Sequence, residues 1–259
     1  MTTRFDCSLN GVSLSGLDER ICVTGILEKS PQRELTTLSL MNLEGERLLA
    51  CRRKFIQVEI TLALRERDPA RRRALLALLP LGGDALWLTV STRPGQRLRV
   101  VPEEGPDPDT DWTADIRLVF RSVGDPRWED IQVESLEASG TLPLTLTVPA
   151  GGNTAAVPEG LRITNTGNES ISEMTLKTGS ACQLLTGLAL APGEELTASR
   201  DEWGFISLKI QGEEGTRHAD MCLTGDSDEE LAFSPEEDSL TVTGDGTVTV
   251  TMELRRRWL

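Results

Sequence analysis

Hydrophobic and polar residues alternate along much of the chain, which is the pattern of β-strands that bury one face. The clearest case lies at the C-terminal end, where the even positions are apolar: Val248, Val250, Met252, Leu254 and Trp258. The odd positions there are threonine or charged. Leu240 and Val242 precede Gly244-Asp245-Gly246, a composition typical of a hairpin turn. We therefore predict a hairpin, and we expect its basic last strand to dock outside its acidic neighbourhood.

The first half of the chain predicts strands around a single helix. The predicted strands are Arg4–Leu9, which ends at the turn Asn10-Gly11, and then Ile21–Glu28, Leu35–Met41, Asn42–Leu49, Lys54–Leu64, Ala85–Ser91, Arg97–Val101 and Ala114–Arg121. Asp68-Pro69 is typical of a helix start, with Asp68 as the N-cap and Pro69 at the first helical position. Leucines at helical spacing follow, and Pro80 ends the pattern. A helix over residues 68–80 is therefore expected.

The second half predicts a β-sandwich, because short strands recur every 8–12 residues with turn residues between them. The predicted strands are Ile131–Ala138, Leu142–Val148, Leu161–Asn165, Ile171–Lys177, Cys182–Leu185, Glu194–Ala198, Phe205–Ile210 and Met221–Leu223. The texture changes at Ser139-Gly140, where we place the domain boundary. The fold class expected for the whole chain is all-β, mainly strands with one short helix.

Charge narrows the range of partners. The formal net charge is −14, and residues 141–259 hold 8 Lys and Arg against 19 Asp and Glu. An acidic surface repels nucleic acid and anionic membranes, and it suits either solubility or a partner with basic patches. The five cysteines have no metal-ligand spacing and indicate core residues in a reducing compartment. No signal-peptide core or membrane-length apolar run is present, so synthesis in the cytosol and no membrane insertion are expected.

Catalytic and metal-binding patterns are absent from the sequence. His218 is the only histidine, which excludes the common zinc patterns and leaves a nucleophilic triad without support. No glycine-rich nucleotide loop occurs, and the acidic run from Asp226 to Asp238 does not fit an EF-hand. We therefore expect no catalytic residues, no metal and no cofactor. Trp203 and Phe205 are weak candidates for a ligand platform, with a core strand as the equal alternative.

Two charged stretches have two interpretations each. Arg71, Arg72 and Arg73 lie near the start of the expected helix, where they form either a solvated face or a patch that meets an acidic neighbour. The acidic, proline-rich stretch from Glu103 to Asp111 forms an exposed loop, which serves either solvation or contact with a partner.

Several short segments, taken in order, resemble one protein family. They are Leu9-Asn10-Gly11-Val12-Ser13-Leu14, the strand–helix–strand unit Phe55–Leu88, Phe120 followed by Asp125-Pro126-Arg127-Trp128, Gly151–Pro158, Leu161–Asn165 and Val248–Leu259. This ordered set is similar to the distal tail (Dit) proteins of long-tailed phages and prophages. One segment departs from the family pattern: Ser234–Asp238 stands where the family often has a Pro-Gly-Asn turn.

The resemblance implies a structural hub at the tip of a phage tail. Residues 1–138 plus 246–259 would form a tube-like, ring-forming β-domain that contains the helix, and residues 139–245 a galectin-like β-sandwich. Six copies would form a ring with DNA in transit through its lumen. The implied partners are the tail tube protein, the tape measure protein, the tail-tip or tail-associated lysin protein and receptor-binding or peripheral baseplate proteins. The implied location is the virion, after assembly in the bacterial host cytoplasm.

Six residues are interface candidates on this interpretation: Arg71, Arg72, Arg73, Arg255, Arg257 and Trp258. The alternatives are a carbohydrate-binding β-sandwich protein, which would use Trp203, and another tail-tube component. A hydrolase with a carboxylate pair is a further alternative, but no residue pattern singles one out.

Overall fold

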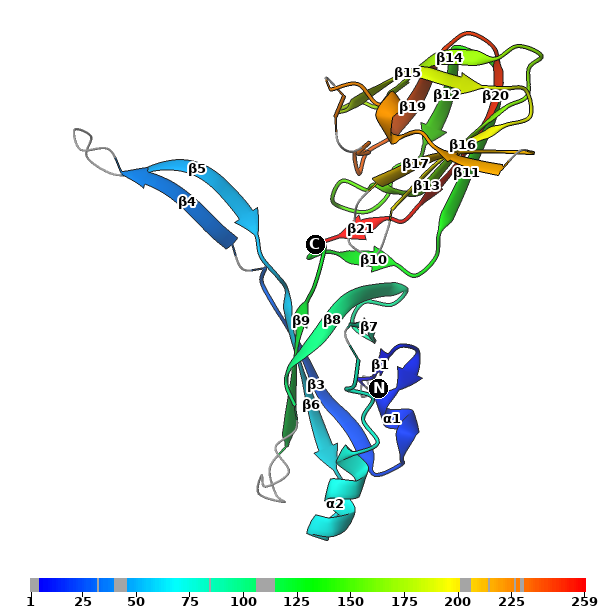
Figure 1. Cartoon of the computed structure of the whole chain (residues 1–259). Coiled ribbons are helices and arrows are strands. Elements are labelled where there is room, and N and C mark those ends of the chain that lie inside the picture. The colour runs from blue at the N-terminus through cyan, green and yellow to red at the C-terminus, as the bar shows by residue number, and fades with distance from the viewer. Residues whose placement is uncertain are drawn as a thin grey trace. The chain divides into compact units, whose positions relative to one another are not determined.

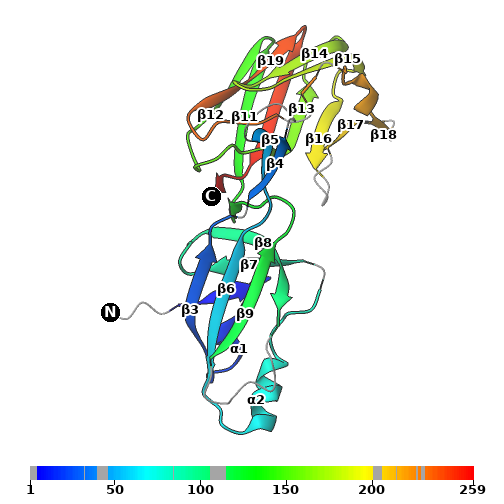
Figure 2. The same cartoon turned by 90° about the vertical axis from the view of Figure 1, so that its left-hand side faces the viewer.

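A computed structural model describes residues 5–31, 33–39, 46–83, 85–105, 115–200, 206–213, 215–225, 227–228 and 231–259. The chain divides into two compact units: the N-terminal unit, Met1–Trp128, and the C-terminal unit, Glu129–Leu259. Both units are built mainly from β-strands (Figures 1 and 2), so the all-β prediction is confirmed. No helix among the described residues is long and apolar enough to span a membrane.

The N-terminal unit holds strands β1 to β9 and two helices. Their bounds are β1 Cys7–Leu9, β2 Val12–Ser13, α1 Leu14–Leu17, β3 Ile21–Lys29, β4 Arg33–Ser39, β5 Glu46–Arg53, β6 Gln57–Leu64, α2 Pro69–Leu76, β7 Leu86–Val90, β8 Gln96–Glu104 and β9 Ile116–Ser122. The strand β10, Trp128–Asp130, contains the point at which the chain passes from one unit to the other.

An antiparallel sheet in the order β2-β1-β7-β8-β9-β6-β3 forms the N-terminal unit. The Asn10-Gly11 turn joins β1 to β2, and both residues have positive φ, as a tight hairpin requires. Val58, Ile60 and Leu62 alternate along β6 and are fully buried, as their spacing predicts. Trp128 is also fully buried in this core.

Helix α2 begins as the sequence predicts but is shorter. The Asp68 side chain caps it by accepting a hydrogen bond from the Ala70 N–H at 2.9 Å, and Pro69 opens the first turn. The helix ends at Leu76, four residues before Pro80. Leu75 and Leu76 are buried, and Leu79, beyond the last turn, is buried as well. Beyond Leu76 the N–H groups of Leu78 and Leu79 donate to the carbonyl oxygens of Leu75 and Leu76, so the helix ends in a turn that buries Leu79.

The C-terminal unit holds the remaining strands and one short 3₁₀ helix. Their bounds are β11 Glu134–Thr141, β12 Leu144–Val148, β13 Pro158–Asn165, β14 Ile171–Lys177, β15 Cys182–Leu190, β16 Glu195–Arg200, β17 Ile206–Gly212, β18 Gly215–His218, η1 Asp220–Cys222, β19 Asp238–Gly244, β20 Thr247–Leu254 and β21 Arg257–Trp258.

Two antiparallel sheets face each other in this unit, so the predicted β-sandwich is confirmed. Among the described residues one sheet has the order β11-β20-β13-β16-β17-β18 and the other the order β12-β19-β14-β15. The inward side chains of both sheets form one apolar core, which includes Ile163, Leu185, Phe233 and Val242. One predicted strand is wrong: Asp220–Cys222 is a 3₁₀ turn, and Leu223 forms only an isolated bridge with Leu185.

The prediction for the closing strand is half right. Val248, Val250, Met252 and Leu254 are fully buried, which confirms the one-sided pattern. The partners are different from those expected, because β20 pairs with β11 and β13 inside the C-terminal unit. The chain divides after Trp128, and β20 belongs to the C-terminal unit, whereas β21 pairs with β10, the strand in which the chain passes from one unit to the other.

The expected hairpin at Gly244–Gly246 is also wrong. Strand β19 pairs with β12 and β14 in one sheet, whereas β20 belongs to the other. The turn therefore carries the chain across the sandwich. Gly244 and Gly246 both have positive φ, and a Cβ on Gly244 would lie 2.8 Å from the Glu173 carbonyl oxygen. Glycine is needed here for a crossing between sheets, which composition alone does not distinguish from a hairpin.

Candidate assembly interface

Strands β4 and β5 form a two-stranded arm that leaves the sheet of the N-terminal unit (Figure 1). Among the described strands they pair only with each other, and every described side chain of β4 from Arg33 to Leu38 is exposed. The arm continues the β3–β6 pair, whose last register is Lys29 opposite Gln57. One long hairpin therefore has an inner half in the sheet and an outer half outside it.

Ion pairs fasten the arm at its root. The Lys29 ammonium donates a hydrogen bond to Gln57 Oε1 at 2.8 Å and pairs with the Glu59 carboxylate. Arg117 on β9 reaches the same carboxylate at 2.6 Å. The hydrogen bond from Lys29 and the nearby Arg117 charge hold the pKa of Glu59 below its usual range. These contacts fix the point where the hairpin leaves the sheet.

One face of the arm is apolar in its middle, between the Arg33–Arg53 pair at one end and the Ser39–Glu46 pair at the other. Leu35 lies opposite Cys51 and Thr37 opposite Leu48, and side chains two residues apart along a strand share a face. Leu35 is 60% exposed, and Leu48 and Leu49 are each 56% exposed. The register shift beside Thr36 and Thr37 leaves Leu49 without a partner on β4. The opposite face carries Glu34, Thr36 and Leu38.

The exposure of this face is costly in water. Burial of one leucine side chain is worth about 1.5–3 kcal/mol, and an isolated two-stranded ribbon is at best marginally stable. Both edges of the arm also present backbone groups that no third strand satisfies among the described residues. Exposed apolar patches of this kind mark interaction surfaces. The arm is therefore the best candidate for a contact with another chain.

The apolar face of the arm carries an exposed cysteine, whereas the N-terminal core holds a buried one. Cys51 on the apolar face of the arm is exposed, and Cys182 at the start of β15 is exposed in the C-terminal unit. Cys7 is buried in the N-terminal core, where burial, aided by the Asp6 carboxylate, raises the pKa of its thiol to about 12. A thiol with that pKa is inert near neutral pH. Cys51 thus offers a reactive probe within the candidate interface.

The sequence-predicted basic residues near the C-terminus have partners inside their own unit. Arg255 Nε donates to Glu159 Oε1 at 2.5 Å, and Arg255 Nη1 donates to the carbonyl oxygens of Asp130, at 3.0 Å, and Ile131. Trp258 Nε1 donates to Asp130 Oδ1 at 2.7 Å. These contacts tie the closing segment, Arg255–Leu259, to the first residues of the C-terminal unit.

Close backbone approach completes this tie. The Asn153 N–H donates to the Arg257 carbonyl oxygen at 3.1 Å, and the Leu259 N–H donates to Asn153 Oδ1 at 2.8 Å. Gly152 has φ +79°, and a Cβ there would lie 2.6 Å from the Arg257 carbonyl oxygen. Arg256 is buried and donates from Nε and Nη2 to Glu134 Oε2 at 3.0 and 2.6 Å. The closing segment is an internal clasp.

The arginines of α2 are not one surface patch. Arg72 is 4% exposed, whereas Arg71 and Arg73 are exposed. Arg71 Nε lies 3.7 Å from Asp68 Oδ2, the helix N-cap. Helical geometry places successive residues about 100° apart, so a run of three cannot share one face. Arg71 and Arg73 remain interface candidates, and Arg72 is part of the buried side.

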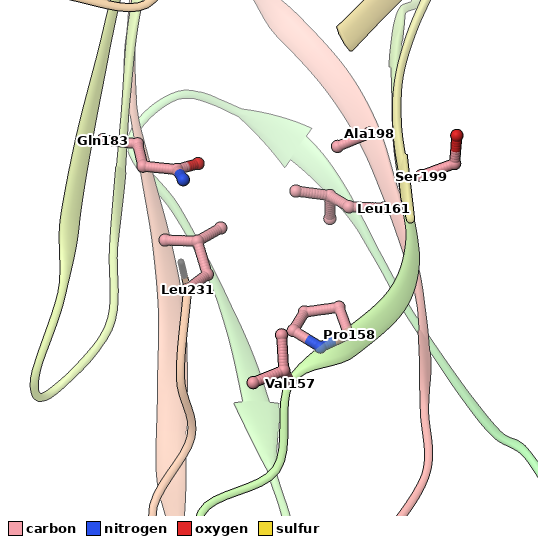
Figure 3. A pocket seen from close by; sticks show the side chains of 7 residues that line it. All are labelled: Val157, Pro158, Leu161, Gln183, Ala198, Ser199 and Leu231. Carbon is pink, nitrogen blue, oxygen red and sulfur yellow. The ribbon is translucent and has the colours of Figure 1, made fainter. Parts of the chain in front are cut away.

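The remaining site predictions concern ligands. Trp203 and Phe205 lie outside the described residues. No group of three potential metal ligands occurs among the described side chains, and His218 is exposed with Nδ1 3.4 Å from Asp220 Oδ2. A cavity of about 30 Å³ lies between Val157, Leu161 and Leu231 (Figure 3). Gln183 points into it.

Sequence reasoning placed strands at the arm but did not identify it as exposed. The available signal was a broken alternation: Leu48, Leu49, Ala50 and Cys51 run consecutively and are followed by Arg52 and Arg53. Such a run cannot bury all its apolar residues on one side of a sheet. A strand of this kind between two charged stretches is a candidate for a contact outside the chain.

Comparison with known proteins gives the fold a counterpart. No protein-family model and no curated protein matches the sequence. Among solved structures, the chain is similar to the SPP1 Dit (gp 19.1) protein, described as a paradigm of the hub adsorption apparatus in phages that infect Gram-positive bacteria. The similarity covers 98% of this chain and 99% of that chain, with a TM-score of 0.70 and 14% sequence identity.

The chain is also similar to structures of the phage P2 baseplate in its activated conformation. For the structure with Ca, the similarity covers 99% of this chain and 98% of the matched chain, at a TM-score of 0.46 and 7% sequence identity. For the structure with Sr, the similarity covers 98% of this chain and 97% of the matched chain, at a TM-score of 0.48 and 7% sequence identity. The SPP1 similarity extends over both units, so the chain has the fold of a Dit protein from end to end.

Proposed function

We propose that this chain is a structural, non-enzymatic subunit of a phage or prophage tail tip. Six copies form a ring that joins the tail tube to the baseplate. The observation that carries the proposal is the similarity to the SPP1 Dit protein over 98% of the chain, at a TM-score of 0.70. A carbohydrate-binding sandwich alone would have no use for the N-terminal unit and its arm, whereas a ring subunit needs both.

The exposed arm is an argument for the proposed ring. Its leucine face is exposed, and its edges are open among the described strands. A head-to-tail contact between identical chains closes into a ring when the rotation between neighbours is a whole fraction of a turn. In such a ring each arm lies on the next subunit and each subunit receives one arm. Every copy then buries Leu35, Leu48 and Leu49 without a new type of partner.

Charge supports a division of labour between the units. The N-terminal unit holds 19 Lys and Arg against 18 Asp and Glu, whereas the C-terminal unit holds 8 against 23. Near-neutral surfaces associate with copies of themselves more readily than strongly acidic ones do. The N-terminal unit therefore builds the ring around the passing DNA. The acidic sandwich meets receptor-binding or peripheral baseplate proteins through their basic patches.

The other partners follow from a position at the end of the tube. The tail tube and tape measure proteins contact one side of the ring, and the tail-tip or lysin protein contacts the other. The assembled protein belongs to the virion, and the ring forms in the cytoplasm of the bacterial host. Arg71 and Arg73, which are exposed on α2, are candidates for contacts with a neighbouring component.

The first test measures assembly of the full chain by light scattering and negative-stain microscopy at increasing concentration. We expect six-subunit rings for the wild type. The double variant Leu35→Ser, Leu48→Ser removes the apolar face and should remain monomeric with unchanged melting of both units. Leu38→Ser is the matched control, because Leu38 is also an exposed leucine on β4 but lies on the opposite face. Rings of unchanged stability in the double variant would contradict the arm contact.

The second test uses the cysteines as an internal footprint. A maleimide reagent should label Cys51 and Cys182 in dilute protein, since both are exposed. In the assembled state Cys51 should become protected by ten-fold or more, while the labelling rate of Cys182 should stay within two-fold. Equal rates for Cys51 in both states would show that the apolar face of the arm is not covered.

A further inference from the structure

The outer face of the larger sheet in the C-terminal unit contains a groove of about 310 Å³. Its floor is formed by β13, β16, β17 and β20, four adjacent strands in the middle of the sheet. The side chains below these strands are buried in the sandwich core, so the residues between them point outward. The groove lies on the side of the sheet opposite the core.

The strand registers arrange the outward side chains in rows. Thr251, Arg162, Thr197 and Lys209 are successive partners across the four strands and form the central row. Glu195 pairs with Gln211 in the row on one side. Glu253 pairs with Gly160 in the row on the other side. Strands lie about 4.8 Å apart, so each row spans about 14 Å.

Much of the hydrogen-bonding capacity in this groove is uncommitted. Among the described residues, the Lys209 ammonium, the Gln211 amide and the Glu253 carboxylate form no side-chain hydrogen bond or ion pair. The Arg162 guanidinium has only a long contact, with Nη1 3.9 Å from Glu195 Oε1, and its side chain is 61% exposed. Elsewhere on the sandwich, Arg217 and Arg255 make close ion pairs. The contrast marks the groove as a surface whose polar groups are available.

A glycine deepens the groove at one point. Gly160 lies within β13, where glycine weakens a strand and often marks a bulge or a close approach by another molecule. The register does shift between Pro158 and Gly160. The φ of Gly160 does not require glycine, and a Cβ there would meet only Glu253 Oε2, at 3.7 Å. A larger residue would therefore fit the backbone and would fill the space beside Arg162.

We propose that this groove binds a neutral oligosaccharide. Its charged groups are of both signs, Arg162 and Lys209 against three glutamates, and hydroxyl and amide groups lie among them. Mixed donors and acceptors match a ligand that presents many hydroxyl groups. An anionic ligand would meet the glutamates and an acidic unit, and a cationic one would meet Arg162 and Lys209. The proposal is independent of ring formation.

A peptide ligand fits this surface less well. Extended peptides bind by adding a strand to an open sheet edge, and helical peptides bind in apolar grooves. The floor strands β13, β16, β17 and β20 are each paired on both sides, so their backbone groups are already used. The outward side chains that line the groove are polar or charged. Binding must therefore come from side-chain hydrogen bonds to a polyhydroxylated ligand.

The test applies the full chain to an array of neutral oligosaccharides, followed by saturation-transfer NMR with each sugar that binds. We expect millimolar to submillimolar binding by the wild type. Arg162→Ala should weaken binding at least ten-fold, and Gly160→Gln should block the groove with an equal or larger loss. Lys177→Ala is the matched control, because Lys177 is an exposed cation on β14 in the other sheet. Its affinity should stay within two-fold of the wild type.

Thermal melting of each variant separates loss of the site from loss of the fold. Weaker binding counts for the proposal only if the melting temperature is within a few degrees of the wild type. The absence of binding to every sugar on the array would overturn the proposal, as expected if the groove serves a protein partner instead. Undiminished binding by Gly160→Gln would overturn it as well, because the sugar would then bind elsewhere.

Discussion

The arm and strand β20 are both β-structure with leucine, valine or methionine side chains. These side chains are exposed in the arm and buried in β20. In β20, Val248, Val250 and Met252 are fully buried between two neighbouring strands and an opposing sheet. In the arm, Leu35 and Leu48 are more than half exposed. The difference teaches that strand formation and burial are separate properties. Local pattern predicts the first, and the number of available neighbours determines the second.

Removal of an apolar side chain should separate the two regions most sharply. Met252→Ala should lower the free energy of unfolding of the C-terminal unit by about 3 kcal/mol, because it leaves a cavity in a closed core. Leu48→Ala should change the stability of the dilute chain by less than about 0.5 kcal/mol. Calorimetry of both variants checks this. A large loss for Leu48→Ala in the monomer would mean that the arm packs against its own chain.

Backbone contacts at the closing segment give the second comparison. Gly152→Ala should cost about 2–3 kcal/mol, because φ is +79° and the new Cβ would collide with the Arg257 carbonyl oxygen. Gly193→Ala is the matched control, since its φ is +81° but no atom lies within 4 Å of its Cβ. Its cost should be only that of the backbone conformation, about 1 kcal/mol. Equal losses in urea unfolding would contradict the close approach.

Trp258→Phe should have a smaller effect on the same segment. The substitution keeps an aromatic ring but removes the indole N–H that donates to Asp130 Oδ1 at 2.7 Å. A lost hydrogen bond of this kind costs about 1 kcal/mol, and the half-buried Asp130 carboxylate can recover part of it from water. The loss should appear in unfolding of the C-terminal unit while the N-terminal unit is unaffected. A loss confined to the N-terminal unit would restore the original expectation for this segment.

The smallest expected difference is in how two ion pairs, Arg217–Glu194 on the sandwich and Lys54–Glu34 at the arm, affect stability at acid pH. Arg217 donates to Glu194 at 2.5 and 2.7 Å and holds the pKa of Glu194 below its usual range. Stability from this pair is present above the ordinary glutamate pKa and is lost as pH falls through the lowered folded-state pKa. Arg217→Gln should remove about 0.5 kcal/mol at neutral pH and less at low pH, where only the hydrogen bond from Arg217 to the Ala189 carbonyl oxygen is lost.

The exposed pair on the arm is the control for that titration. Lys54 Nζ and Glu34 Oε1 are 3.5 Å apart, and both side chains are about half exposed. Lys54→Gln should leave unfolding unchanged at every pH, because solvent screens such a pair. The same pH dependence in Lys54→Gln as in Arg217→Gln would show that the effect is one of net charge.

Local features of the sequence predicted much of the fold. The Asn10-Gly11 turn, the Asp68-Pro69 helix start and the buried positions of β20 depend on neighbours within a few residues, and all three are confirmed. Predictions that depend on distant partners did less well. Gly244 and Gly246 lie at a crossing between sheets, and β20 pairs with β11, more than 100 residues earlier in the chain.

The candidate interface could be predicted only in part. Charge suggested that Arg255 and Arg257 face another surface, but Arg255 pairs with Glu159, a carboxylate that sequence order does not place nearby. The arm was predicted as strands without a statement of exposure, because pairing with other strands cannot be read from alternation. The polar groove was missed entirely, since its rows combine four strands from distant parts of the sequence.

The chain crosses between its two units once, within Trp128–Asp130, and the side-chain hydrogen bonds described above for the closing segment go to residues after Trp128. One genetic exchange at this point would therefore transfer a whole sandwich, with its clasp and its groove, onto another N-terminal unit. An insert with two connections would need two coordinated breakpoints for the same result. This arrangement makes the C-terminal half inheritable as a single cassette, free to diverge while the N-terminal half keeps its own constraints.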